Sequence, residues 1–106
     1  MMGAEGGIGG TYGAMPEVYL KIYNCFKEGD LETAHKLQYL ANDIIGDLCG
    51  CHGNMYAVIK EVVRIREGLE LGDVRAPLAN IADTDAEKIS KCVEKIDAVF
   101  KNYINR

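Results

Sequence analysis

Apolar residues recur every three or four positions through most of this chain, and this spacing is the period of an amphipathic α-helix. The clearest stripe runs from Ala34 to Leu48, starts after the capping residue Asp30 and ends at the break formed by residues 49–53. Beyond residues 1–10, no segment alternates apolar and polar residues as a strand would. The pattern predicts a mainly all-α chain that forms a three- to four-helix bundle.

Residues that favour helix ends mark the limits of the expected helices. Proline suits a first turn, aspartate and asparagine suit the N-terminal cap, and glycine suits the position after the last turn. Such residues stand at Pro16, Gly29, Asp30, Asn54 and Gly68. Together with the apolar spacing, they predict helices at about residues 16–28, 31–49, 55–67 and 84–105.

The last helix is expected to begin with a capping box, Thr84-Asp85-Ala86-Glu87. In such a box the threonine hydroxyl accepts the N–H of Glu87, and the Glu87 carboxylate accepts the N–H of Thr84. Residues 69–82, which lie before the box, contain glycine and proline and read as an irregular connection.

Length and charge argue against several classes of protein. With 106 residues, the chain has room for one domain with one core. Its formal charge of -4 is spread over mixed-sign helical faces and forms no basic stripe, which argues against nucleic-acid binding. No apolar run approaches the roughly 20 residues that span a bilayer, and the first residues do not resemble a secretory signal. We expect a cytosolic protein that does not contact membranes.

Four cysteines raise the question of a disulfide or a metal, and the sequence favours neither. Cys25 and Cys92 lie inside helical patterns and nothing suggests export, so reduced thiols are expected. Cys49, Cys51 and His52 could supply three zinc ligands, but no second cluster completes a tetrahedron. A tight turn between two helices is the simpler interpretation, and no metal or cofactor is expected.

The stretch AEGGIGGTYGAMPEVY, residues 4–19, places glycines directly before the first helix. A loop without side chains lets backbone N–H groups approach a carboxylate or a sugar hydroxyl closely. Glycine also tolerates the positive φ angles that such a loop can require. The stretch therefore reads as the end of a β-strand followed by a loop that can bind an anion.

Two segments carry a family resemblance. GAEGGIGGTYGAMPEVYLKIYNCFKEGDLETAHKLQ, residues 3–38, and LGDVRAPL, residues 71–78, resemble the carboxy-terminal part of N-acetylneuraminate lyases. These enzymes fall within the dihydrodipicolinate synthase superfamily of pyruvate-dependent aldolases. The resemblance implies the last strand, loop and helix of a (β/α)8 TIM barrel, followed by a three-helix carboxy-terminal extension. Residues 1–13 would then be the glycine-rich strand and loop, and residues 14–106 the helical region.

The resemblance also implies where substrate would bind. Gly9, Gly10 and Thr11 would lie at the C-terminal rim of the barrel, where binding groups of such folds collect. Many lyases have Gly-Ser-Thr at these positions, so the hydroxyl that would contact the substrate's polyol is replaced by hydrogen at Gly10. In the connection near the last helix, Arg75 is expected to tie loop carbonyls together. The tyrosines are expected to pack, with their hydroxyls toward polar edges.

The chemistry implied by the family needs residues that precede this segment. An intact enzyme would reversibly cleave N-acetylneuraminate to pyruvate and N-acetylmannosamine through a Schiff base on a sixth-strand lysine, assisted by a tyrosine. The lysines of this chain all lie on predicted helices and are expected to face water as poor nucleophiles: Lys21, Lys27, Lys36, Lys60, Lys88, Lys91, Lys95 and Lys101. The chain alone is therefore expected to have no catalytic residue and no activity.

The expected partners of this chain follow from the apolar surface that the rest of a barrel would cover. The apolar face of the first helix would lack its sheet, so a homo-oligomer is expected, with the glycine-rich segment poorly ordered or exchanged between chains. The natural partner would be the missing amino-terminal part of the barrel, and sialic acid or pyruvate would bind only in the intact enzyme. Two alternatives stay open: a self-associating helical interaction module, and one half of a split aldolase.

Overall fold

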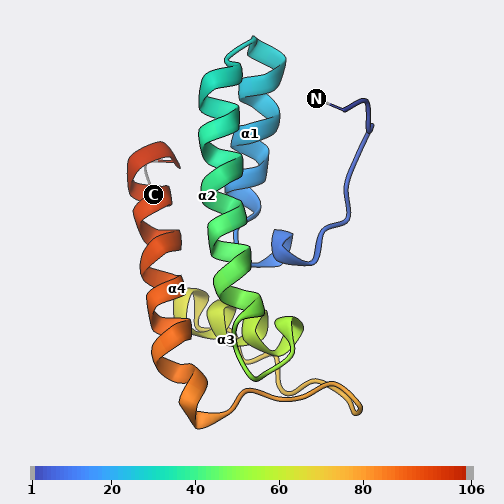
Figure 1. Cartoon of the computed structure of the whole chain (residues 1–106), viewed down its shortest axis with the longest axis vertical. Coiled ribbons are helices and arrows are strands. Elements are labelled where there is room, and N and C mark those ends of the chain that lie inside the picture. Colours follow the sequence, from blue (N-terminus) through green and yellow to red (C-terminus); the bar gives the residue numbers. More distant parts are fainter. Residues whose placement is uncertain (1, 105–106) are drawn as a thin grey trace.

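The computed structural model describes residues 2–104, and it is built from helices joined by short turns and one long connection (Figure 1). The main helices are α1 (Pro16–Glu28), α2 (Leu31–Cys49), α3 (Met55–Glu67) and α4 (Ala86–Val99). Shorter turns are the 3-10 helices η1 (Gly10–Gly13) and η2 (Asp83–Asp85) and the π-helical turn η3 (Phe100–Ile104). No strand occurs within residues 2–104, and the prediction of a mainly all-α chain is confirmed.

The ends of α1, α2 and α3 lie where the capping residues place them. The Asp30 carboxylate accepts the N–H of Thr33 at 3.1 Å, and the Asn54 side chain caps α3 in the same way. Gly29 and Gly68 follow the last turns of α1 and α3 with φ angles of 85° and 71°, which side chains rarely tolerate. These three helices therefore have the bounds expected from the sequence.

The predicted capping box at the start of the last helix is wrong. Residues 83–85 form η2 instead, and α4 begins only at Ala86. The Asp85 N–H donates to the Ala82 carbonyl at 2.9 Å, and the Asp85 carboxylate accepts the Ala82 N–H at 3.0 Å. Asp85 thus organises this helix start in place of Thr84. At the other end, the expected helix reaches Asn105, which lies outside the described residues.

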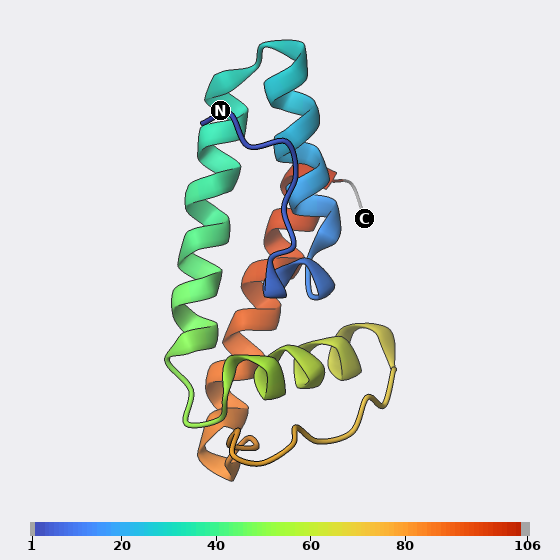
Figure 2. The same cartoon turned by 90° about the vertical axis from the view of Figure 1, so that its right-hand side faces the viewer.

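The helices α1, α2 and α4 run along the length of the molecule, with α2 antiparallel to the other two, and α3 lies across their lower end (Figures 1 and 2). α1 and α2 run side by side as a hairpin, and α4 packs along α2 (Figures 1 and 2). α3 crosses the lower end of this layer, where it contacts α2, α4 and the turn η1. The arrangement brings the residues just before α1 next to α3, although the two segments are far apart in the sequence.

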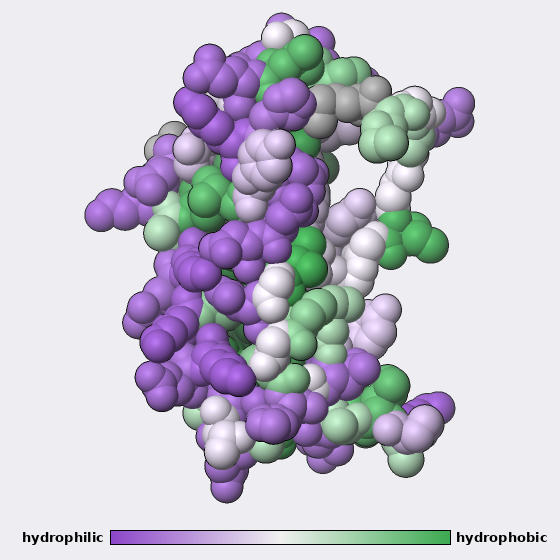
Figure 3. All heavy atoms as spheres, viewed as in Figure 1, coloured by the Kyte–Doolittle hydropathy of each residue, from purple (hydrophilic) through white to green (hydrophobic). Residues whose placement is uncertain are grey.

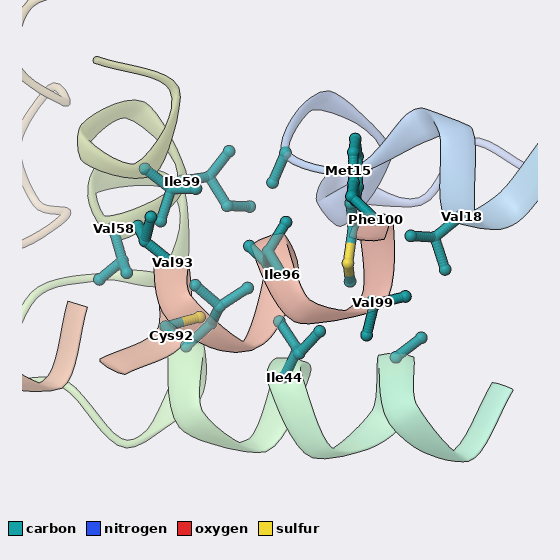
Figure 4. Packing of buried hydrophobic residues seen from close by; sticks show 14 of the residues in the cluster. Met15, Val18, Ile44, Val58, Ile59, Cys92, Val93, Ile96, Val99 and Phe100 are labelled. Atoms are coloured by element: carbon teal, nitrogen blue, oxygen red, sulfur yellow. The ribbon is translucent and has the colours of Figure 1, made fainter. Parts of the chain in front are cut away.

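One apolar cluster joins all of these helices. Figure 4 shows its side chains pointing from α2, α3, α4 and the residues at the start of α1 toward a shared interior. Met15, Val18, Leu37, Ile96 and Phe100 are among its fully buried members. Burying such side chains is the main favourable term in folding. The residues that precede α1 are therefore part of the core.

The segment before η1 lies apart from the bundle. Residues 2–9 form no strand and are exposed, and the Ile8 side chain is as exposed as in an open chain. A strand without neighbours has no partners for its backbone N–H and C=O groups. The expected division between residues 1–13 and 14–106 stays a prediction, and Met1 lies outside the described residues.

The connection between α3 and η2 is held by a lysine. The Lys60 ammonium donates to the carbonyls of Asp73 at 2.9 Å and Leu71 at 3.5 Å. Arg75, which was expected to make such contacts, is exposed instead. The role expected of Arg75 therefore falls to Lys60, because α3 runs beside the connection and Lys60 points toward it.

Candidate functional site

The glycine-rich segment ends in the turn η1, which a buried threonine fixes to α1. Gly9 and Gly10 are exposed, and the Tyr12 N–H donates to the Gly9 carbonyl at 3.2 Å. Thr11 is 6% exposed, and its Oγ1 lies 2.6 Å from the Tyr19 hydroxyl. Of the three residues expected to bind substrate, Thr11 is therefore buried in the protein, whereas the backbone of the two glycines is exposed.

Tyrosine rings lie close to the Cβ positions of Gly9 and Gly10. A Cβ atom at Gly9 would lie 2.6 Å from Tyr12 Cε1, and one at Gly10 would lie 2.9 Å from Tyr56 Cε1. Gly9 itself has a φ of -64°, and the positive φ angles of the N-terminal segment are confined to Gly3. The idea that this loop needs glycine for positive φ angles is wrong at Gly9 and Gly10. A side chain at either position would instead have to displace a tyrosine ring.

An apolar groove lies beside this segment. It has a volume of about 270 Å³ and runs between residues 4–7 and one face of α1, where Tyr19, Ile22, Tyr23 and Phe26 line it. In Figure 3 the left-hand side of the molecule is largely hydrophilic, and apolar residues are more frequent on the right-hand side. Burial raises the pKa of Tyr19, although its bond to Thr11 partly offsets this, so its phenol stays neutral at neutral pH.

The lysines all lie on helices of the described part of the chain, and none is buried. Lys95 has the most charged surroundings, since its ammonium lies 2.9 Å from the Asp43 carboxylate and 2.6 Å from that of Asp47. Hydrogen bonds to these two carboxylates raise the pKa of Lys95. A lysine must lose its proton to attack a carbonyl. The amine of Lys95 is therefore held in the protonated form.

The cysteines are all free thiols. Cys49 is exposed and Cys51 is half-buried, while Cys25 and Cys92 are buried in the bundle. Burial raises the pKa of Cys92 to about 11 and also raises that of Cys51. Among residues 2–104, no group of three His, Cys, Asp or Glu side chains could hold a metal ion. Cys49 ends α2, and Cys51 lies in the turn between α2 and α3.

Asp85 is a buried charge that sequence reasoning assigned only to the capping box. Its side chain is fully buried, and it accepts backbone N–H groups from His52 at 2.8 Å, Gly53 at 2.9 Å and Ala82 at 3.0 Å. The N–H of Ala82, followed by that of His52, lowers the pKa of the Asp85 carboxyl to about 2. This carboxylate ties the α2–α3 turn to the start of α4. Its role is structural.

Comparison with known proteins defines the class. Residues 1–96 match the model of the dihydrodipicolinate synthetase family, and the chain belongs to this family. The family resemblance predicted from the sequence is confirmed.

Within residues 2–104, no helix is long and apolar enough to cross a membrane.

The individual relatives are sialic acid lyases. The chain is 50% identical over 104 residues to an N-acetylneuraminate lyase of Mediterraneibacter gnavus, covering 98% of this chain and 33% of the relative. It is 27% identical to an N-acetylneuraminate lyase of Clostridium perfringens, covering 97% of this chain and 32% of that protein. The structure of wild-type Ruminococcus gnavus sialic acid aldolase matches with a TM-score of 0.93 and 51% identity, over 95% of this chain and 34% of that one. The chain thus spans about a third of the length of these relatives.

Proposed function

We propose that this chain is the carboxy-terminal third of an N-acetylneuraminate lyase-like aldolase. The intact enzyme would cleave N-acetylneuraminate to pyruvate and N-acetylmannosamine through a lysine Schiff base. The observation that carries the proposal is the 50% identity to a lyase over 98% of this chain, together with the TM-score of 0.93 against a sialic acid aldolase. The chain would contribute part of the rim and a helical support for the barrel.

At the rim, we assign Gly9 and Gly10 to contact with the substrate and Thr11 to support of the loop. The two glycines are exposed and carry no side chain that would keep a ligand from the backbone. Thr11 holds the turn against α1 through its 2.6 Å contact with the Tyr19 hydroxyl. Replacing Thr11 by valine would remove this hydrogen bond at little change in size, and the proposal expects a weaker rim rather than a lost reaction.

The reactive amine would come from another part of the enzyme. In Schiff-base chemistry the lysine amine attacks the keto carbon, and water leaves as the carbon–nitrogen double bond forms. Ion pairs favour a protonated lysine, which cannot make this attack, and Lys95 of this chain forms two such pairs. The chain alone would therefore be inactive, and pyruvate or sialic acid would bind only to the intact enzyme.

The exposed face of α1 is our candidate for the surface that the rest of the barrel covers. Leu20, Tyr23 and Phe26 are 61%, 51% and 43% exposed, which is unusual for three large apolar side chains on one helix. In the isolated chain the same face would drive self-association. Light scattering at high concentration should give a dimer or larger, and Phe26→Glu should shift it toward the monomer. A monomeric parent chain would contradict this part of the proposal.

A split enzyme is the second candidate, because the chain spans only a third of its relatives. In that case the chain would dock onto a separately made amino-terminal portion. We also propose a cytosolic location, which the four free thiols support.

Expression of the longer reading frame tests the proposed function. If the coding sequence continues upstream, the longer protein should release pyruvate from N-acetylneuraminate, whereas this chain alone should not. If a separate gene encodes the amino-terminal portion, mixing the two purified proteins should restore the reaction. Absence of lyase activity from both the longer protein and the mixture would overturn the proposal and leave a helical interaction module as the better explanation.

A further inference from the structure

The side chain of Arg66 reaches from the last turn of α3 to the residue that follows η1. Its Nη1 donates to the Ala14 carbonyl at 3.3 Å, and its Nε donates to the Asp97 carboxylate on α4 at 3.0 Å. The guanidinium lies 4.2 Å from the centre of the Phe100 ring, which belongs to the buried cluster shown in Figure 4. The side chain is only 10% exposed. Contacts with three segments therefore fix the guanidinium, and the guanidinium in turn ties the Ala14 carbonyl to α3.

Ala14 is also bonded to the turn that carries the two exposed glycines. The Ala14 N–H donates to the Thr11 carbonyl at 3.1 Å, and the Tyr12 N–H donates to the Gly9 carbonyl at 3.2 Å. Ala14 is 4% exposed, so its carbonyl lies where water has little access. A continuous set of hydrogen bonds thus runs from Arg66 through Ala14 and Thr11 to the place where Gly9 and Gly10 expose their backbone.

The chemistry of this contact requires an arginine. A guanidinium is planar, is always charged and can donate to two acceptors in fixed directions, whereas a lysine ammonium is a single point at the end of a flexible stem. Arg64, one turn earlier on α3, provides the contrast: it is 45% exposed and pairs with Glu61 of its own helix. Arg66 therefore makes contacts between segments that Arg64 does not make.

We propose that Arg66 is a positioning residue of the aldolase site. It holds η1 against α3 so that the exposed backbone of Gly9 and Gly10 keeps its place at the rim, and it does not touch the substrate or the reactive lysine. This inference rests on the proposed function. It makes the helical extension responsible for the geometry of the substrate-binding rim, so the loss of Arg66 should weaken substrate binding and leave the bond-breaking step unchanged.

Hydrogen exchange followed by NMR tests the structural half on this chain. Arg66→Ala should speed the exchange of the Tyr12 and Ala14 amides roughly tenfold more than that of Ile44, a core residue of α2 that is 1% exposed. Asp97→Asn is the matched control, because it weakens the ion pair between α3 and α4 but keeps an acceptor for Arg66 Nε. It should leave the Tyr12 and Ala14 amides unchanged relative to Ile44. Equal acceleration at all three amides, or the same result in Asp97→Asn, would overturn the inference.

The functional half requires the enzyme that contains this chain. Arg66→Ala should raise the KM for N-acetylneuraminate by about three- to tenfold, as expected for a displaced rim, and kcat should change by less than about twofold. The yield of the borohydride-trapped pyruvate adduct should stay the same, because the reactive amine lies outside this chain. Arg66→Lys should give a smaller rise in KM, and it carries the same test if Arg66→Ala does not fold. Arg64→Ala and Asp97→Asn should leave KM unchanged.

The outcomes separate this inference from the proposed function. An active enzyme in which Arg66→Ala lowers kcat without raising KM, or in which Arg64→Ala or Asp97→Asn raises KM equally, would overturn the positioning role and leave the lyase assignment intact. A parent enzyme without lyase activity would overturn the proposed function and the role in substrate binding together. The exchange measurements decide in either case whether Arg66 fixes η1.

Discussion

At the scale of single residues, Asp85 is a charged side chain that is fully buried. Its carboxylate is buried and accepts three backbone N–H groups, from His52, Gly53 and Ala82. Backbone N–H groups that lose a buried acceptor keep the cost of their desolvation. Asp85→Asn keeps the shape but supplies one acceptor oxygen where there were two, and we expect the Tm near neutral pH to fall by roughly 5–10 °C.

The same residue predicts an acid-sensitive stability. The pKa of Asp85 is about 2 in the folded chain against an ordinary 3.8, so the folded state binds this proton less readily than the unfolded state. The stabilisation is therefore complete above about pH 4 and is lost as the pH falls toward about 2. Chemical unfolding at a series of pH values should show this loss. It should be smaller in Asp85→Asn and unchanged in the control Asp83→Asn, since Asp83 is exposed; equal pH profiles in all three proteins would contradict the assignment.

Single-residue contacts were the least predictable from the sequence. The family resemblance pointed to Gly9, Gly10 and Thr11, and their role in binding substrate stays a prediction. The resemblance gave no sign that the rings of Tyr12 and Tyr56 determine where glycine is required. The contact between Gly10 and Tyr56 joins residues that are far apart in the sequence, and helical periodicity carries no information about it or about the local contact between Gly9 and Tyr12.

At the scale of elements, the turn between α2 and α3 depends on a close backbone approach. A Cβ atom at Gly53 would lie 2.9 Å from Ile81 Cα and 3.1 Å from Ile81 N, and neither atom can move without shifting the main chain. We expect Gly53→Ala to reduce the free energy of unfolding by about 1–3 kcal/mol. Gly50→Ala in the same turn should be nearly neutral, because its Cβ would meet nothing closer than 3.5 Å. Urea unfolding of both variants checks this, and similar losses would contradict it.

Arg66 joins α3 to α4 and to the residues before α1. Its side chain is 10% exposed, bonds the Asp97 carboxylate at 3.0 Å and the Ala14 carbonyl at 3.3 Å, and lies 4.2 Å from the centre of the Phe100 ring. Lysine keeps the charge but loses the planar group that makes these contacts together. Arg66→Lys should cost about 1–2 kcal/mol in urea unfolding.

The matched control for this change is Arg64→Lys on the same helix. Arg64 is 45% exposed and pairs with Glu61 one turn away, so the substitution should change the unfolding free energy by less than about 0.5 kcal/mol. If Arg66→Lys is as mild as Arg64→Lys, then Arg66 does not hold the three segments together.

Helix limits could be predicted where local residues determine them. Asp30 and Asn54 cap their own helices, and Gly29 and Gly68 take left-handed angles, so the sequence alone was sufficient for three helices. The start of α4 could not be predicted in this way, because Asp85 bonds the α2–α3 turn rather than its own helix. The start of α4 therefore depends on a tertiary contact and not on a capping residue of its own.

At the scale of the whole molecule, the bundle has a complete core but leaves two features uncovered. The exposed apolar residues of α1 and the extended residues 2–9 lie outside the buried cluster. In a barrel, the apolar residues of α1 would pack against the sheet, and residues 2–9 would lie between two neighbouring strands. The all-α fold could be inferred from the sequence because helical spacing extends over most of the chain. The family could be inferred because the glycine-rich segment and the helices after it resemble those of the lyases.

The central claim is that the reactive amine of the proposed aldolase lies outside these 106 residues. Incubation with pyruvate and borohydride, followed by intact-mass measurement and peptide mapping, tests it most directly. The isolated chain should keep its mass, and the longer enzyme should gain one reduced pyruvate adduct on a lysine upstream of this segment. A stoichiometric adduct on a lysine within this chain, such as Lys60 or Lys95, would contradict the claim.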